Sequence, residues 1–90
     1  MNPIQWSPHA LENLAEREVD RTEAEAALHH PEFVVDDPPG RRILMRRYLD
    51  SVLRQEMLLR VVVEESADEL IVVTVYKTSQ IKRYLKGLIP

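Results

Sequence analysis

The sequence predicts an α+β fold in which two N-terminal helices pack on a four-stranded antiparallel sheet and a short C-terminal helix closes the chain. Three observations lead to this prediction. Capping signals for two helices lie near the N-terminus, the hydrophobic period then becomes strand-like, and turn residues divide the remainder into four apolar segments. A chain of 90 residues without a linker or repeat is expected to form one domain, residues 1–90.

Two helices are expected first. Ser7 is a suitable N-cap for a helix over Pro8–Arg17, which begins with the residue that best suits the first helical position. Asp20 followed by Glu23 has the pattern of a capping box and predicts a second helix that ends near His29. The chain therefore begins with a helical pair.

Alternating apolar residues and turn signals then predict four strands and a short helix. Turns are expected at Asp36–Gly40 and at Ser66–Asp68, where proline, glycine, aspartate and serine gather. The expected strands cover residues 32–35, 42–49, 53–64 and 69–76, and the closing helix covers about residues 79–86. Consecutive strands with short turns favour an antiparallel meander.

Strand alternation assigns the expected sheet faces. The side that meets the helices is expected to carry the apolar residues Leu59, Val61, Val63, Ile71, Val73 and Val75. The second face is expected to carry Arg60, Thr74 and Tyr76, together with either Arg46 and Tyr48 or Arg47. Because this second face is half apolar, we expect the closing helix, a second copy of the chain or a protein partner to cover it.

The composition favours a soluble, cytoplasmic protein. The chain lacks cysteine, which excludes disulfides and thiolate metal sites, and no segment resembles a signal peptide or a membrane span. Residues 1–40 hold nine acidic and two basic side chains, whereas residues 41–90 hold ten basic and six acidic ones. This division predicts either a positive face that binds RNA or ordinary solvated charges.

Several short motifs together resemble a bacterial family of domains of unknown function that is distantly related to RelE-like and BrnT-like toxins. The motifs are His9-Ala10, Arg17-Glu18-Val19, Leu59–Val63, Thr74–Ser79 and Lys82-Arg83-Tyr84. The resemblance implies a RelE-like form of the fold and a toxin-like, metal-independent endoribonuclease that cleaves RNA through 2′-hydroxyl attack without a cofactor. It also implies an antitoxin-like partner on the same face. Many relatives have glycine where this chain has Glu18, so whether the turn between the helices has the same geometry here is left undecided.

The resemblance implies a phosphoryl-transfer site made of His9, Arg17, Arg60 and Tyr76. Histidine titrates near neutral pH, and guanidinium groups match phosphate oxygens, so His9 would transfer a proton and the two arginines would hold phosphate. Tyr76 would donate a hydrogen bond or stack on a base. Further contacts to RNA phosphate are expected from Arg46, Arg47, Thr78, Ser79 and Arg83.

Each of these residues also has a structural interpretation. Arg60 interrupts an apolar strand and can pair with Glu64 or with an acid on a neighbouring strand. Thr78 or Ser79 can cap the closing helix, and His9 can simply face solvent. His29 and His30 do not form a metal site, because adjacent helical residues point about 100° apart.

Two functions from different classes are therefore carried forward. The first is the toxin-like ribonuclease that the resemblance implies. The second is a non-catalytic, protein-binding or homodimeric module, which the negative total charge and the half-apolar second face favour.

Overall fold

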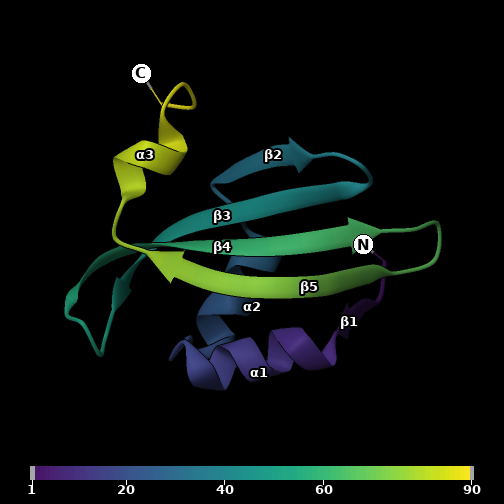
Figure 1. Cartoon of the computed structure of the whole chain (residues 1–90), viewed down its shortest axis with the longest axis horizontal. Coiled ribbons are helices and arrows are strands. Elements are labelled where there is room, and N and C mark those ends of the chain that lie inside the picture. The colour runs from purple at the N-terminus through teal and green to yellow at the C-terminus, as the bar shows by residue number, and fades with distance from the viewer. Residues whose placement is uncertain (1, 90) are drawn as a thin grey trace.

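A five-stranded mixed sheet forms the centre of the molecule (Figure 1). The computed structural model describes residues 2–89, and the strand order is β1-β5-β4-β3-β2. Strands β2 to β5 pair antiparallel with their neighbours, whereas β1 is parallel to β5. The strands are β1 (Ile4–Trp6), β2 (Phe33–Asp37), β3 (Arg41–Asp50), β4 (Gln55–Glu65) and β5 (Leu70–Thr78).

The predicted RelE-like fold with a four-stranded, wholly antiparallel sheet is wrong, because β1 adds a fifth, parallel strand. Ile4 lies opposite Leu70 and Trp6 lies opposite Val72. Sequence reasoning missed this strand because it has only three residues, too few to show alternation, and lies between Pro3 and the helix cap. Its partner lies at the other end of the chain, so no local signal announces the pairing.

Three helices accompany the sheet, and the first two begin at their predicted caps. They are α1 (Pro8–Glu16), α2 (Arg21–His29) and α3 (Ile81–Leu85). The Ser7 side chain accepts the Ala10 amide, and the Asp20 carboxylate accepts the Thr22 amide. Glu18, between α1 and α2, has φ +52°, so the turn keeps the left-handed conformation that glycine adopts most readily.

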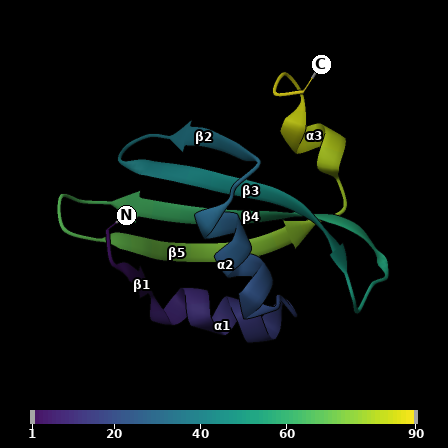
Figure 2. The same ribbon diagram turned by 180° about the vertical axis from the view of Figure 1, so that it is seen from behind.

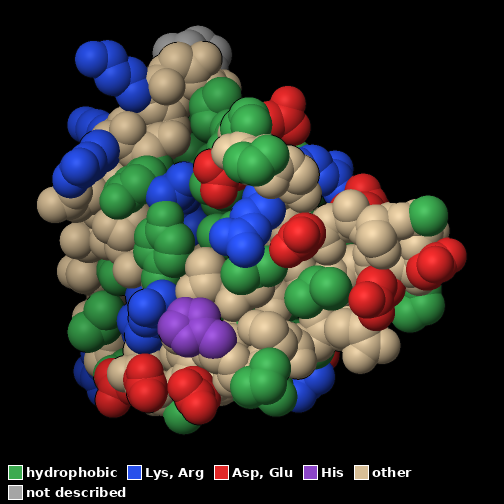
Figure 3. Space-filling model, turned by 45° about the vertical axis from the view of Figure 1, so that its right-hand side comes forward, with side chains coloured by type: hydrophobic (Ala, Val, Ile, Leu, Met, Phe, Trp, Pro, Cys, Tyr) green, Lys and Arg blue, Asp and Glu red, His purple; other side chains and the backbone are tan. Residues whose placement is uncertain are grey.

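The four arginines of β3 are held by partners rather than forming a separate positive face. Because β3 lies between β2 and β4, its arginines reach acids or a carbonyl on both sides. On the face shown in Figure 3, basic and acidic side chains are interspersed. The pairs are Arg41–Glu64 at 3.8 Å, Arg42–Glu65 at 3.0 Å, Arg47–Glu32 at 3.1 Å, and Arg46 donating to the His30 carbonyl at 2.8 Å.

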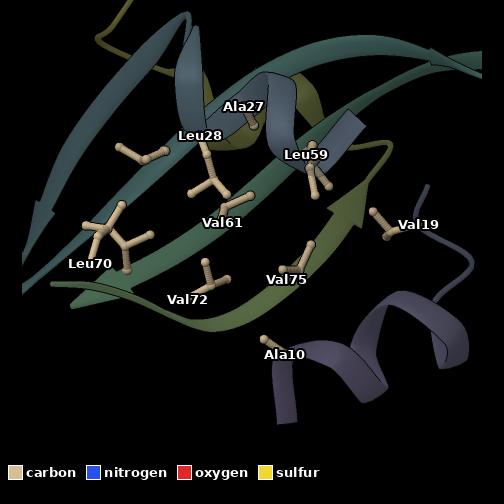
Figure 4. Packing of buried hydrophobic residues seen from close by; sticks show 12 residues of the cluster. Ala10, Val19, Ala27, Leu28, Leu59, Val61, Leu70, Val72 and Val75 are labelled. Carbon is tan, nitrogen blue, oxygen red and sulfur yellow. The ribbon is translucent and has the colours of Figure 1, made fainter. Parts of the chain in front are cut away.

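The main core lies between the sheet and the helices α1 and α2, which Figure 2 shows on one side of the sheet. Leu59, Val61 and Val63 of β4 are buried there, as alternation predicts. In β5 a register shift opposite Val62 and Val63 breaks the alternation. As a result Leu70 and Val72 join Val75 in this core, whereas Ile71 and Val73 do not belong to it, so their expected places on this side are wrong (Figure 4).

Helix α1 also covers the edge of β5 beyond the end of β1. Ser7 Oγ donates to the Val73 carbonyl at 3.1 Å, and Asn13 Oδ1 accepts the Val75 amide at 3.0 Å. Arg17 Nη1 donates to the Val75 carbonyl at 2.9 Å. An exposed strand edge invites pairing with other chains, so these side chains satisfy backbone groups and block that edge.

A smaller apolar cluster lies on the second face of the sheet. Met45 and Leu58 are fully buried there, and Leu85 of α3 packs against them. The closing helix is therefore the part of the chain that covers this end of the second face. None of the helices in residues 2–89 has the length and apolar character that a membrane crossing requires.

Candidate functional site

Arg60 lies in the middle of the second face of the sheet. It belongs to β4, which runs between β3 and β5. Its neighbours Leu59 and Val61 point into the main core, so alternation turns Arg60 the other way. In the pairing register Arg60 lies between Met45 of β3 and Tyr76 of β5. The sheet therefore fixes the position of this arginine from both sides.

The Arg60 side chain is held between two tyrosine rings. Its guanidinium carbon lies 5.3 Å from the centre of the Tyr76 ring and 4.1 Å from that of Tyr84. Its Nη1 atom also donates a hydrogen bond to the Tyr76 hydroxyl. Arg83 extends the group, with its guanidinium carbon 5.6 Å from the Tyr84 ring. We call Arg60, Tyr76, Tyr84 and Arg83 the Arg60 cluster.

In the structural interpretation Arg60 was expected to pair with an acid, but it packs on the rings of Tyr76 and Tyr84 instead. Among residues 2–89 no carboxylate pairs with Arg60, neither Glu64 nor another acid across the strands. Its Nε atom is buried and has no hydrogen-bond partner in the described part of the chain. A guanidinium group that lacks a carboxylate keeps its positive charge available to an anion.

Burial raises the pKa of the Tyr76 hydroxyl, although the neighbouring Arg60 charge partly opposes that shift. The phenol is therefore protonated at neutral pH. Its oxygen accepts the hydrogen bond from Arg60, which leaves its own proton free for another acceptor. Tyr76 is thus placed as a hydrogen-bond or proton donor beside a fixed cation.

Helix α3 brings the second tyrosine to the cluster. Leu85 is fully buried and belongs to the same apolar cluster as Met45 and Leu58. That packing places the preceding residue, Tyr84, over Arg60. The helix ends before Gly87, whose φ of +85° suits the predicted stop. The contact of the Tyr84 ring with Arg60 was not predicted from the sequence.

A cavity of about 580 Å³ adjoins the cluster and carries three basic side chains. Three of the predicted phosphate contacts, Arg47, Ser79 and Arg83, line it together. Arg47 forms an ion pair with Glu32. The hydrogen bond from Arg47 lowers the pKa of the Glu32 carboxyl. We call this cavity the basic pocket, and its lining is Arg47, Glu56, Ser79, Gln80, Ile81, Lys82, Arg83 and Ile89.

The other predicted site residues lie away from the cluster or have structural partners. His9 is exposed on α1 and makes no hydrogen bond with the cluster. Arg17 binds the β5 backbone, although its charge still acts on the Tyr76 pKa. Arg46 holds the His30 carbonyl, and the Thr78 hydroxyl accepts the Gln80 amide. Of the predicted catalytic set, only Arg60 and Tyr76 are in direct contact.

The choice left open for β3 is settled by the register. Tyr48 packs against the main core on the side of α1 and α2, so Arg46 shares that side. Arg47 lies opposite Leu58 and therefore belongs to the second face. The second-face arginine of β3 lines the basic pocket beside the Arg60 cluster.

A protein-family model described as a domain of unknown function (DUF4258) matches residues 6–77, which include Arg60 and Tyr76. The chain belongs to the DUF4258 family. The expected membership of a family of unknown function is confirmed. No curated protein and no solved structure matches the chain. The DUF4258 match stops before α3, so the Tyr84 and Arg83 part of the cluster lies outside the matched residues.

The described DUF4258 fold offers no cluster of metal ligands. Within residues 2–89, no group of three or more histidine or acidic side chains is close enough to hold a metal ion. The adjacent histidines at the end of α2, His29 and His30, are both exposed. The chemistry open to the Arg60 cluster is binding of anions, stacking of planar rings and proton donation by Tyr76.

Proposed function

We propose that the protein binds single-stranded RNA at the Arg60 cluster and cleaves it there as a toxin-like, metal-independent endoribonuclease. The observation that carries this proposal is the position of Arg60 between two tyrosine rings without a carboxylate partner among the described residues. Proteins hold single-stranded RNA by stacking its bases on aromatic or guanidinium planes and by charged contacts to its phosphates. The cluster supplies both kinds of contact on one face.

The basic pocket adjoins the Arg60 cluster and lengthens the surface that an RNA strand would occupy. Arg83 belongs to both the cluster and the pocket, so a base stacked near Tyr84 would have its next phosphate close to Lys82 and Arg83. The pocket also contains Ile81 and Ile89, which give it an apolar part. A chain of alternating rings and phosphates matches this mixture of surfaces.

Cleavage would follow from the same contacts. The 2′-hydroxyl oxygen bonds to phosphorus, the bond to the 5′ oxygen breaks, and a 2′,3′-cyclic phosphate forms. Arg60 would neutralise the non-bridging oxygens, and Tyr76 would protonate the leaving 5′ oxygen. The 2′-hydroxyl proton would pass to water, because His9 is exposed on α1 and makes no hydrogen bond with the cluster. We therefore expect slow turnover.

Cleavage and binding are tested with purified protein and a fluorescent single-stranded RNA in the presence of EDTA. We expect wild-type protein to bind and cleave, and Arg60→Ala to lose both. Arg60→Lys keeps a charge and a long stem, so it separates loss of the guanidinium plane from loss of folding. Arg21→Ala is the matched control, because Arg21 is an exposed arginine on α2. Full activity in Arg60→Ala would contradict the proposal.

A non-catalytic binding module is the second candidate. It is favoured by the exposed position of His9, which leaves the cluster without the proton acceptor that efficient cleavage requires. In that case wild-type protein would bind RNA with the same dependence on Arg60 but release no 2′,3′-cyclic product. Binding and cleavage measured on one RNA therefore separate the two candidates.

A further inference from the structure

The β3–β4 hairpin displays apolar side chains at its tip. In Figures 1 and 2 it extends past the sheet at the end where α1 meets α2. The exposed fractions are 74% for Leu49, 61% for Val52 and 47% for Leu53. Neighbouring apolar side chains that stay exposed on a small protein often mark an interaction site.

The conformation of this tip is fixed from within by Asp50, which is 3% exposed. Its Oδ1 atom accepts the amides of Val52 and Leu53, each at 2.9 Å. Its Oδ2 atom accepts the Tyr48 hydroxyl at 2.9 Å and Lys77 Nζ at 2.8 Å. The tip therefore presents its apolar side chains in a set arrangement, which lowers the entropy lost when a partner binds.

A pocket of about 450 Å³ lies between the hairpin tip and the turn that joins α1 to α2. Lys77 ties its two walls together, because Nζ donates to the Glu18 carbonyl at 2.8 Å and to Asp50 at 2.8 Å. Val19, Tyr48 and Val52 supply its apolar surface. The pocket is thus a concave site of mixed apolar and polar lining.

The rim of this pocket is acidic. Glu18, Asp20 and Glu23 line it, and none of them forms an ion pair within residues 2–89. The Lys77 charge is already used by the buried Asp50 carboxylate. Uncompensated carboxylates around a partly apolar pocket attract a ligand that carries positive charges beside an apolar group.

We propose that this pocket, which we call the hairpin pocket, binds a cationic amphipathic segment of another protein. One apolar side chain would enter between Val52 and Tyr48, and flanking lysines or arginines would pair with Glu18 and Glu23. The chain's own basic and apolar segment is not the occupant, since Leu85 is buried on the second face and Ile89 lines the basic pocket. The hairpin pocket shares no residue with the Arg60 cluster, so this binding does not depend on the RNA proposal.

Fluorescence anisotropy with a labelled peptide of sequence LKKLLKKL tests the proposal, and LEELLEEL is the matched probe of opposite charge. We expect the lysine peptide to bind and the glutamate peptide not to bind. Glu18→Gln with Glu23→Gln should weaken binding about five- to tenfold, as expected for rim charges. Glu12→Gln with Glu16→Gln removes the same charge from exposed positions on α1 outside the pocket and should leave binding unchanged.

The apolar contribution is tested with Leu49→Ser and Val52→Ser together. Both side chains are mostly exposed, so the variant should fold normally and weaken binding of the lysine peptide about tenfold or more. Leu11→Ser, at an exposed apolar position on α1, is the control. Absence of binding, or equal loss in the pocket and control variants, would overturn the proposal. So would a dimer in light scattering that disappears in the hairpin variant, because a second copy would then occupy the pocket.

Discussion

Replacement of Asp50 by alanine is expected to destabilise the fold by about 3 kcal/mol. The Asp50 carboxylate accepts four hydrogen bonds, and the side chains of Asp50 and Lys77 are only 4% and 11% exposed. Removing one partner of a buried ion pair costs roughly 3–5 kcal/mol, because the remaining charge stays without compensation. We take the lower end, since the Lys77 amine retains the Glu18 carbonyl as a partner.

The loss is measurable because a domain of this size has little stability to spare. Its total unfolding free energy is expected to be roughly 5–13 kcal/mol. A loss of about 3 kcal/mol corresponds to a fall in Tm of roughly 12–24 °C. Urea unfolding followed by the fluorescence of Trp6, the one tryptophan of the chain, gives the free energy directly.

Asp68→Ala is the matched control, because Asp68 is exposed in the β4–β5 turn and forms no ion pair within the described residues. We expect its effect to stay within about 0.5 kcal/mol. A loss below about 1 kcal/mol for Asp50→Ala would refute the reasoning, since it would show that the hairpin and the Lys77 amine do not depend on this carboxylate.

The pH dependence of this effect has a defined sign. The hydrogen bond from Lys77, then that from the Leu53 amide, holds the pKa of Asp50 well below its ordinary value of 3.8. A carboxyl with a lowered pKa in the folded state contributes its full stability above its unfolded pKa and loses it as the pH falls. The difference between wild type and Asp50→Ala should therefore be constant near neutral pH and shrink below about pH 4.

Two further variants test the strand edge and the site. Asn13→Ala should cost about 2 kcal/mol in urea unfolding, because it leaves the buried Val75 amide without its acceptor, and an unchanged midpoint would contradict the edge-covering role of α1. Tyr76→Phe keeps the ring but removes the hydroxyl, so RNA binding should persist while cleavage falls about 100-fold or more. Unchanged cleavage in that variant would exclude Tyr76 as the proton donor.

Features with local signals could be predicted from the sequence. The caps Ser7 and Asp20 start their helices where expected, because capping depends on residues within one turn. The position of Arg60 and Tyr76 on the same face of the sheet follows from strand alternation. These predictions use contacts between residues that are close in the chain or in consecutive strands.

Features that depend on distant contacts could not be predicted. The strand β1 is too short to signal itself, and its partner β5 lies at the far end of the chain. Arg17 was expected in the phosphoryl-transfer site, but it holds the β5 edge together with Asn13. The register shift in β5 moved Val72 into the main core, and no residue type marks that shift in the sequence.

The central claim is that the Arg60 cluster holds single-stranded RNA, and an NMR titration tests it most directly. A short uridine oligonucleotide is added to labelled protein in EDTA, and the amide shifts are followed for each residue. We predict that the largest shifts lie at Arg60, Tyr76 and residues 79–84, and that Arg60→Ala abolishes them. Shifts confined to the face of α1 and α2, or none at millimolar RNA, would contradict the account.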